Sequence, residues 1–405
     1  MPDAPAHPAL RPVEIVQALS GDGTIALRDP SGRSPHIVSV SHGVMYILAR
    51  LDGTRSLIDI QADYMRRFGR MLFSDELAKL LAQLDEAMLL DGPRFRAHMA
   101  QVERRYRESP VRAAIHADGV GDDPRAYFGT LLDHPADAEP RGGGRLLGVI
   151  APHLDYARGR PCYAAAYADL LRHTDATRFV ILGANHFGAR RAVVATRKDF
   201  ATLDGVVPHD GEFMQRIERR LNADLCEGEL DHEREHSVEL QVHVLRHVLG
   251  DRDFRIAPYL CPDPCGPTGT RPSDGRGVDL RDFAAGLGET LRDDPTPTCL
   301  IAAADLSHVG EYFQDDTGMD AASLARVEAH DRRLLNSLAA EGPEAFRSAV
   351  AATQNATNIC SVGCIYVLAT ALHGRATATM RRYHQAVTRE MRNCVTCAAV
   401  DFREE

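Results

Sequence analysis

Four near-continuous apolar runs of strand length constrain the fold of this chain more than any other feature. They are LLGVIA (146–151), RFVILG (178–183), RIAPYL (255–260) and CLIAAA (299–304). Stretches with helical patterning, such as PCYAAAYADLLRH, lie between them. Buried strands that alternate with helices indicate an α/β domain with a mostly parallel central sheet flanked by helices.

Three of these runs lead directly into a histidine. VIAPHLDY places His153 after the first run, VILGANHFG places His186 after the second, and IAAADLSHVG places Asp305 and His308 after the last. The carboxyl ends of the strands in an open α/β sheet meet at one edge, where ligands bind. Imidazole is the commonest metal ligand among side chains. A single histidine after a strand is usually a loop residue with one hydrogen bond, but three of them together predict a metal site.

The segment EHSVELQVHVLRHVLG, predicted to be a helix, carries further candidates. Glu235 and Glu239 lie four residues apart and share a face, and His236 lies on the adjoining face. We expect Glu235 and His236 to line the site, either as general acid/base groups or as supports for metal ligands. His243 and His247 have a spacing that could bind a metal. The valines and leucines of the helix mark the other side as buried, so we predict that these two histidines are exposed or in an outer layer.

Cys360 precedes the apolar stretch SVGCIYVLATALHG, which is predicted to be helical. A cysteine at a helix N-terminus has a stabilised thiolate and suits a metal ligand or a nucleophile. A free cysteine is equally often a small buried core residue, and the residues alone leave both interpretations open. Cys364, one turn further on, is predicted to be core. Cys394 and Cys397 lie in a predicted strand whose alternation directs them to opposite faces, so we do not expect a redox pair.

The first quarter of the chain has a different pattern. Residues 1–18, Pro- and Ala-rich at their start, are predicted to be disordered. Short extended segments then give way to three amphipathic helical segments, an order typical of a small winged-helix domain over residues 19–95. A charged helical connector is predicted over residues 96–111, and the α/β domain over residues 112–405.

Composition restricts the partners and the compartment. The chain has 47 Lys and Arg against 57 Asp and Glu, a net charge of −10, whereas nucleic-acid binding needs clustered basic residues. No run approaches the roughly 20 apolar residues of a membrane-spanning helix, and no signal-peptide pattern is visible. We therefore expect a cytoplasmic protein that binds neither nucleic acid nor membrane, with its nine cysteines present as thiols or metal ligands.

The motifs PHLDY, LGANH, EHSVELQ and ADLSH, followed by a cysteine before an apolar helix, together resemble the Memo family. The resemblance runs from about residue 110 to residue 402. It implies a fold like that of class III extradiol dioxygenases, which hold Fe(II) with two histidines and a glutamate. Bacterial Memo proteins occur beside an AMMECR-type and a radical-SAM protein, the AmmeMemoRadiSam system, which implies a radical-SAM partner. The resemblance also implies a site of three histidines and one cysteine: His153, His186, His308 and Cys360, with Asp305 adjacent.

The segments ILARLDGTRSLIDIQADYMRRF and DELAKLLAQLDEAMLLDG resemble the PqqD-type domain. That winged-helix module binds the leader segment of a precursor peptide in related pathways. The resemblance implies that residues 19–95 bind a peptide substrate. The alternative is an appendage that stabilises the fold or dimerises.

These features predict a metal-dependent oxidoreductase of the non-heme Fe(II), dioxygenase-like type that acts on a peptide. One divalent metal is expected, with Fe(II) first and Cu or Zn as alternatives, since a thiolate also suits softer metals. His308 is expected as a ligand or base, and the expected catalytic residues are His236, Glu235 and Asp305. Two alternatives remain open: a non-catalytic metal-binding subunit of a peptide-modifying or radical-SAM system, and a hydrolase that uses metal-activated water.

Overall fold

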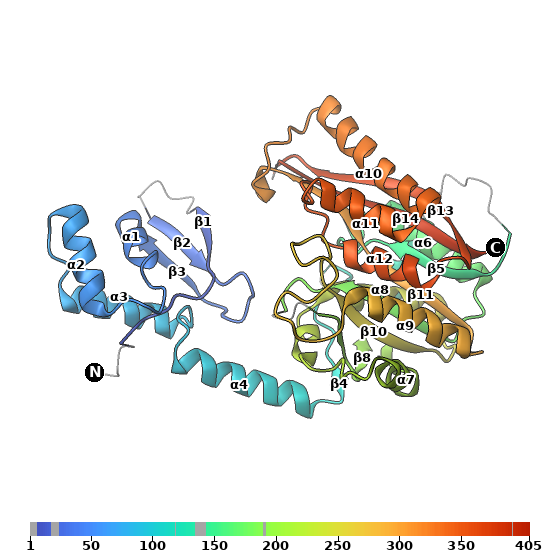
Figure 1. Ribbon diagram of the computed structural model, residues 1–405, viewed down its shortest axis with the longest axis horizontal. Helices are drawn as coiled ribbons and strands as arrows, with labels where there is room; N and C mark the ends of the chain where they lie inside the picture. The colour runs from blue at the N-terminus through green and yellow to red at the C-terminus, as the bar shows by residue number, and fades with distance from the viewer. Residues whose placement is uncertain (1–5, 18–23, 118, 134–142, 189–191, 391) are drawn as a thin grey trace. The chain divides into compact units, whose positions relative to one another are not determined.

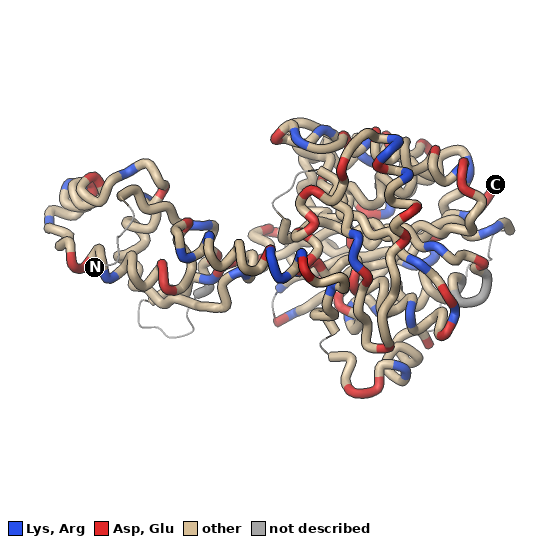
Figure 2. The backbone as a smooth tube through the Cα atoms, turned by 90° about the horizontal axis from the view of Figure 1, so that it is seen from below, with Lys and Arg blue, Asp and Glu red and all other residues tan. Residues whose placement is uncertain are grey.

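The computed structural model describes residues 6–17, 24–117, 119–133, 143–188, 192–390 and 392–405 (Figure 1). The chain divides into two compact units, Met1–Glu108 and Ser109–Glu405. Among the described residues, no helix is both long enough and apolar enough to cross a membrane. Figure 2 shows that basic and acidic residues are interspersed along the chain rather than separated into blocks.

The first unit combines a small antiparallel sheet with helices. Its strands are β1 (Glu14–Gln17), β2 (Thr24–Arg28) and β3 (Ile37–Ser41), in that order. The turn η1 (His42–Val44) and the helices α1 (Met45–Leu48), α2 (Leu57–Phe68), α3 (Ser74–Glu86) and α4 (Pro93–Glu108) follow. Ser56 and Asp59 form a capping box at the start of α2, and Gly69 ends the helix at φ 67°. Buried leucines and isoleucines of the sheet and of α1 to α3 share one core.

Much of the N-terminal segment, predicted to be disordered, has a defined backbone. Ala9 forms a β-bridge with Asp52, and Leu10 forms one with Leu90. Residues 14–17 form β1, which pairs with β2. These long-range pairings satisfy backbone groups of residues that lack any periodic pattern, so the sequence does not reveal them. Residues 1–5 and 18 lie outside the described residues.

The second unit is built on a sheet with the order β12-β14-β5-β11-β6-β10-β7. Its central strands are β5 (Leu146–Ala151), β11 (Thr298–Ala303), β6 (Arg178–Ala184) and β10 (Arg255–Cys261), which are the four predicted apolar runs. Their pairings with one another are parallel. At the edges, β7 (Val194–Ala195), β12 (Asp305–Gly310), β13 (Ala376–Thr388) and β14 (Asn393–Glu404) make antiparallel pairings.

The sheet is therefore mixed rather than mostly parallel, although the predicted α/β class is confirmed. β13 and β14 follow one another along the chain and pair as a long antiparallel hairpin, which needs no crossover helix. β14 then lies antiparallel to both β5 and β12. The half-polar pattern of β13 differs from the continuous apolar runs that mark the central strands.

Helices cover both faces of this sheet. In β6, Phe179 and Ile181 face one core, and Val180 and Leu182 face the other. The first core is shared with α5 (Pro124–Leu132), α6 (Tyr156–His173) and α8 (His236–Leu249). The second is shared with α7 (Gly211–Leu221), α9 (Leu280–Asp293), α10 (Ala321–Glu341), α11 (Pro343–Ala352) and α12 (Val362–Ala371). A small sheet of β4 (Val111–Arg112), β8 (Asp199–Thr202) and β9 (Gly205–Val207), and the turns η2 (Glu229–His232) and η3 (Glu311–Phe313), complete the unit.

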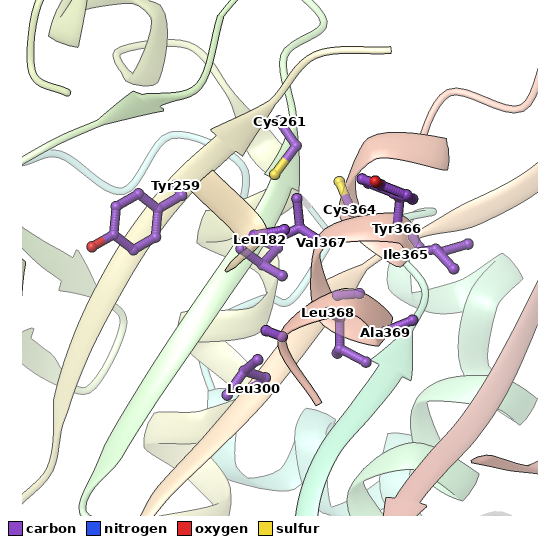
Figure 3. Close-up of a cluster of buried hydrophobic side chains, with 14 of the residues drawn as sticks. Leu182, Tyr259, Cys261, Leu300, Cys364, Ile365, Tyr366, Val367, Leu368 and Ala369 are labelled. Carbon is purple, nitrogen blue, oxygen red and sulfur yellow. The ribbon is translucent and has the colours of Figure 1, made fainter. Parts of the chain in front are cut away.

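The position of α12 matters for the site because Cys360 lies two residues before this helix. Figure 3 shows apolar side chains of α12 packed against Leu182 and Leu300 of the central strands. A Cβ added at Gly363 would lie 2.1 Å from the carbonyl oxygen of Pro262. Glycine at this position therefore lets the start of α12 approach the end of β10 closely. This close approach brings Cys360 to the carboxyl edge of the sheet.

Candidate metal centre

His153 occupies a buried position just beyond β5, with 3% of its surface exposed. Its Nδ1 donates a hydrogen bond to the carbonyl oxygen of Ala303, at the end of β11, over 2.9 Å. This bond leaves Nε2 for a ligand, and Nε2 lies 3.3 Å from Sγ of Cys360 and 3.5 Å from Oδ2 of Asp305. Burial by itself lowers the pKa of His153, but the negative charges of Asp305 and Cys360 outweigh it and raise the pKa to about 9.

His186 follows β6 and is held by Glu235, the residue that caps α8. Its Nδ1 donates to Oε1 of Glu235 over 3.0 Å, and its backbone N–H donates to Oε2 over 2.8 Å. A Cβ added at Gly183 would lie 2.5 Å from Oγ of Ser237, so glycine in β6 lets the start of α8 approach this closely. Burial of Glu235 opposes ionisation, but His186 lowers the pKa of this carboxyl below its ordinary value. These hydrogen bonds are the ones expected of a residue that orients His186 and sets its tautomer, which is one of the two roles predicted for Glu235.

The thiol of Cys360 completes a group of three donors. Its Sγ lies 3.2 Å from Oγ of Ser361 as well as close to His153. Burial opposes ionisation, but the positive charges of His153 and His308 lower the pKa of Cys360 well below its usual value. The thiolate is the form of cysteine that binds metals. The donor atoms of His153, His186 and Cys360 all lie within 4.8 Å of one another.

These residues fit a small divalent metal. Bonds of about 2.0–2.3 Å to nitrogen and sulfur place tetrahedral ligand atoms roughly 3.3–3.8 Å apart, and the 3.3 Å between Nε2 of His153 and Sγ of Cys360 matches this. Both imidazoles have their Nδ1 bonded to protein acceptors. A metal site needs this second layer of bonds to orient its histidines.

Asp305 and His308 lie beside this group in different ways. Asp305 is 2% exposed, and its Oδ1 accepts a hydrogen bond from the backbone N–H of His153. Burial raises the pKa of Asp305 despite the nearby charge of His153. Among the residues that the structure describes, the groups of closely spaced donor atoms do not include His308. Its Nδ1 donates to the carbonyl oxygen of Leu306.

A register shift in β12 precedes His308. The pairing of β12 with β14 shifts between Asp305 and His308. Such a bulge redirects the side chains that follow it. Position after a strand was therefore enough to place His153 and His186 among the three donors, but not His308.

The ring of His236 lies against the ring of His186. The two rings stack with centroids 4.8 Å apart, and the ring of His153 lies 5.5 Å from that of His236. Burial lowers the pKa of His236 to about 3, with the charge of Glu235 partly opposing the shift. His236 is therefore neutral near pH 7, when it can give or accept a hydrogen bond. The donor atoms of His186, Glu235 and His236 also lie within 4.8 Å of one another, as an overlapping group.

A buried network behind His236 was not anticipated. Glu239, on α8, accepts hydrogen bonds from Arg112, from Nδ1 of His116 over 2.7 Å and from the backbone N–H of Ile115. The ring of His116 lies 5.6 Å from that of His236. Arg112 and His116 belong to a short segment without a motif. The sequence therefore offered no signal for the partners of Glu239.

The prediction that His243 is exposed or in an outer layer is wrong. His243 is 2% exposed, and its Nε2 lies 3.4 Å from Oε1 of Glu239. It also accepts a long hydrogen bond from the backbone of Leu203, beside the small sheet. The small sheet covers a face of α8 that its helical pattern marks as polar. His247, by contrast, is only partly buried.

A cavity of about 410 Å³ opens beside two of the three donor residues, His186 and Cys360. Its other walls come from Asn185 and from the segment that follows β10. A third cluster of donor atoms, Glu218, Asp224 and Cys226, lies elsewhere. This cluster suits a metal less well than the group at Cys360, because Arg197 pairs with Glu218 and burial raises the pKa of the Cys226 thiol to about 12.

Two histidines and a cysteine that meet where buried strands end define an α/β protein with a candidate mononuclear metal centre at the edge of its sheet. The profile of the Memo-like protein family matches residues 123–400. The chain therefore belongs to the Memo-like family, as the order of its motifs indicated.

Relatives of known sequence agree with this assignment. A MEMO1 family protein of Aquifex aeolicus is 23% identical over 321 residues, which cover 79% of this chain and 80% of that protein. A MEMO1 family protein of Thermus thermophilus is 28% identical over 294 residues, covering 72% and 82% of the two chains. A MEMO1 family protein of Methanopyrus kandleri is 37% identical over a shorter stretch of 115 residues, covering 28% of this chain and 40% of that protein.

Proposed function

We propose that the second unit is a metal-dependent, oxygenase-like oxidoreductase with one divalent metal held by His153, His186 and Cys360. The observation that carries the proposal is the convergence of three donor atoms within 4.8 Å of one another. Only three protein ligands leave open positions, which is the arrangement of catalytic rather than structural metal sites. The adjoining cavity gives a substrate access to those positions.

Fe(II) is the proposed metal, with Cu and Zn as alternatives. Two imidazoles and a thiolate suit all three, because sulfur is a soft ligand and nitrogen an intermediate one. Bound Fe(II) would supply the electrons for activating dioxygen.

Three side chains next to the donors are the proposed proton-handling groups. Asp305 lies 3.5 Å from Nε2 of His153, and burial raises the pKa of this carboxyl, which places a titratable group beside the metal-binding residues. His236 stacks on His186 and offers a neutral imidazole to a substrate. His308 lies close enough to Cys360 to interact with it electrostatically. Glu235, whose oxygens accept three hydrogen bonds, holds His186 in place instead of moving a proton.

The first unit is proposed to be a PqqD-like winged helix that recognises a peptide substrate. What supports this is the three-stranded sheet followed by helices, together with exposed apolar side chains such as Ile37 and Ile58. In this proposal the chain works in the cytoplasm beside a radical-SAM or other modifying enzyme, as an AmmeMemoRadiSam-type component. The alternative, a non-catalytic metal-binding subunit of the same system, differs only in the absence of turnover.

Metal analysis and oxygen uptake test the proposal. Full-length protein purified without chelator is expected to hold close to one metal per chain and to consume oxygen with a peptide substrate. His153→Ala and Cys360→Ser should abolish both. His373→Ala, which alters an exposed residue of the second unit beyond the end of α12, is the control and should change neither. Metal content without oxygen uptake would favour the non-catalytic subunit, and a folded His153→Ala variant with unchanged metal content would refute the site.

A further inference from the structure

The cavity beside the candidate metal centre has an outer wall of its own, formed by the segment 262–279 between β10 and α9. This segment contributes the charged residues Asp263 and Arg271 and the hydroxyl residues Thr268 and Ser273. His186 and Cys360 line the same cavity. A molecule that fills the cavity therefore contacts both the metal-binding residues and this segment.

The two charged residues of this wall, Asp263 and Arg271, differ in whether they already have a hydrogen-bond partner. Asp263 is engaged within its own segment, where Oδ1 accepts a hydrogen bond from the backbone N–H of Cys265 over 2.9 Å. The guanidinium of Arg271 has no hydrogen-bond or ion-pair partner within the part of the chain that the structure describes. Arg271 is therefore the charge that the cavity leaves for a ligand.

Arg271 is exposed, and local hydrogen bonds fix the backbone from which its side chain extends, even though the segment has no helix or strand. Oγ1 of Thr268 donates to the carbonyl oxygen of Arg271 over 2.8 Å, and the backbone N–H of Arg271 donates back to Thr268. Gly269, at φ 61°, supplies the left-handed turn between them. The backbone N–H of Leu280, the first residue of α9, donates to Thr270 over 2.9 Å and ties this turn to the helix.

We propose that Arg271 is the anchor for a carboxylate group of the ligand, and that this cavity selects carboxylate-bearing molecules. The inference rests on the proposed function only in treating this cavity as the substrate site. A guanidinium binds a carboxylate through two parallel hydrogen bonds, which gives orientation as well as affinity. The volume of about 410 Å³ suits a small molecule or the terminal residue of a peptide. Anchoring at Arg271 directs the rest of the ligand toward His186 and Cys360.

Matched pairs of probes test the carboxylate preference in the full-length protein loaded with Zn(II). Calorimetry compares benzoate with benzamide, and the tripeptide Gly-Gly-Phe with its C-terminal amide. We expect the acid of at least one pair to bind about tenfold or more tightly than the amide, the typical effect of a charged hydrogen-bonded pair. Preference within the first pair identifies a small-molecule carboxylate, and preference within the second a peptide C-terminus.

Variants locate the preference on one residue. Arg271→Gln should abolish the difference between acid and amide, and Arg271→Lys should restore part of it, because lysine keeps the charge but not the two-pronged geometry. Arg276→Gln, an exposed arginine of the same segment, is the control and should bind like the parent protein. Equal binding of acid and amide in the parent, binding of neither, or an unchanged preference in Arg271→Gln would overturn the assignment.

The same measurements on chelator-treated protein and on His153→Ala separate this inference from the proposed function. A carboxylate preference that persists without metal supports the role of Arg271 even if metal loading or oxygen uptake fails. If metal loading and oxygen uptake succeed but the preference is absent, only the anchor is refuted.

Discussion

Replacing Glu235 with glutamine tests whether this carboxylate orients His186 for metal binding. Oε1 of Glu235 accepts from Nδ1 of His186 over 3.0 Å and from the backbone N–H of Ser237 over 2.9 Å. Oε2 accepts from the backbone N–H of His186 over 2.8 Å. Glutamine keeps one oxygen, so its NH₂ group must face at least one of these donors. The fewest hydrogen bonds are lost when the NH₂ group takes the place of Oε2, opposite the backbone N–H of His186.

Two losses then combine. The bond to Nδ1 of His186 loses the strength of a charged acceptor, and one buried N–H loses its acceptor altogether. Together these changes should lower the free energy of unfolding of the metal-free protein by about 1–3 kcal/mol. Metal affinity should fall about 10–100-fold, which is typical when a ligating histidine loses its orienting carboxylate.

Competition against a chromophoric chelator measures the affinity for Zn(II), and urea unfolding of the chelator-treated protein measures stability. Glu212→Gln, at an exposed position in the first turn of α7, is the matched control and should change neither. If Glu235→Gln binds Zn(II) within twofold of the parent while His186→Ala does not bind, Glu235 does not orient His186 and the reasoning fails.

Three further predictions concern the surroundings of the site. The pKa of His153 is raised from 6.5 to about 9 on folding, so the metal-free protein gains up to about 3 kcal/mol from this group below pH 6.5 and loses it as the pH rises through 9. The urea unfolding midpoint should depend less on pH across this range in His153→Gln than in the parent protein, and an equal pH dependence in both would contradict the assignment. Gly363→Ala places a Cβ 2.1 Å from the oxygen of Pro262 and should destabilise the fold by about 1–3 kcal/mol and weaken Zn(II) binding. Gly129→Ala, in open space on α5, should instead stabilise it by about 0.5–1 kcal/mol in urea unfolding. Asp331, which is fully buried, accepts hydrogen bonds from three hydroxyl groups on β12, β13 and β14; Asp331→Ala should lower unfolding free energy by about 1–3 kcal/mol, and an unchanged urea midpoint would show that these hydroxyls find other partners.

Local patterns in the sequence predicted the parts of the site that depend on strand ends. The apolar runs are the four central strands, and His153 and His186 follow two of them at the same edge of the sheet. The motif before α12 identified Cys360, although the choice between a ligand and a core residue needed the family resemblance. These features are predictable because a buried strand and the turn after it are specified by adjacent residues.

Other features depend on contacts between segments far apart in the chain. The antiparallel pairing of β14 with β12 and β5 makes the sheet mixed. The pairing register of β12 shifts just before His308, and His308 is not among the three closely spaced donors. Arg112 and His116 reach Glu239 from more than a hundred residues away.

The sequence by itself therefore determined the α/β class, the family and the strand-end histidines. Only the tertiary structure decided which candidates share one point, that Glu235 is hydrogen-bonded to His186, and that His243 is buried. The physical reason is that periodicity records whether a residue faces a core, whereas distances of 3–5 Å between side chains depend on strand register and on how closely helices approach the sheet. At Gly183 and Gly363 that approach depends on the absence of a side chain.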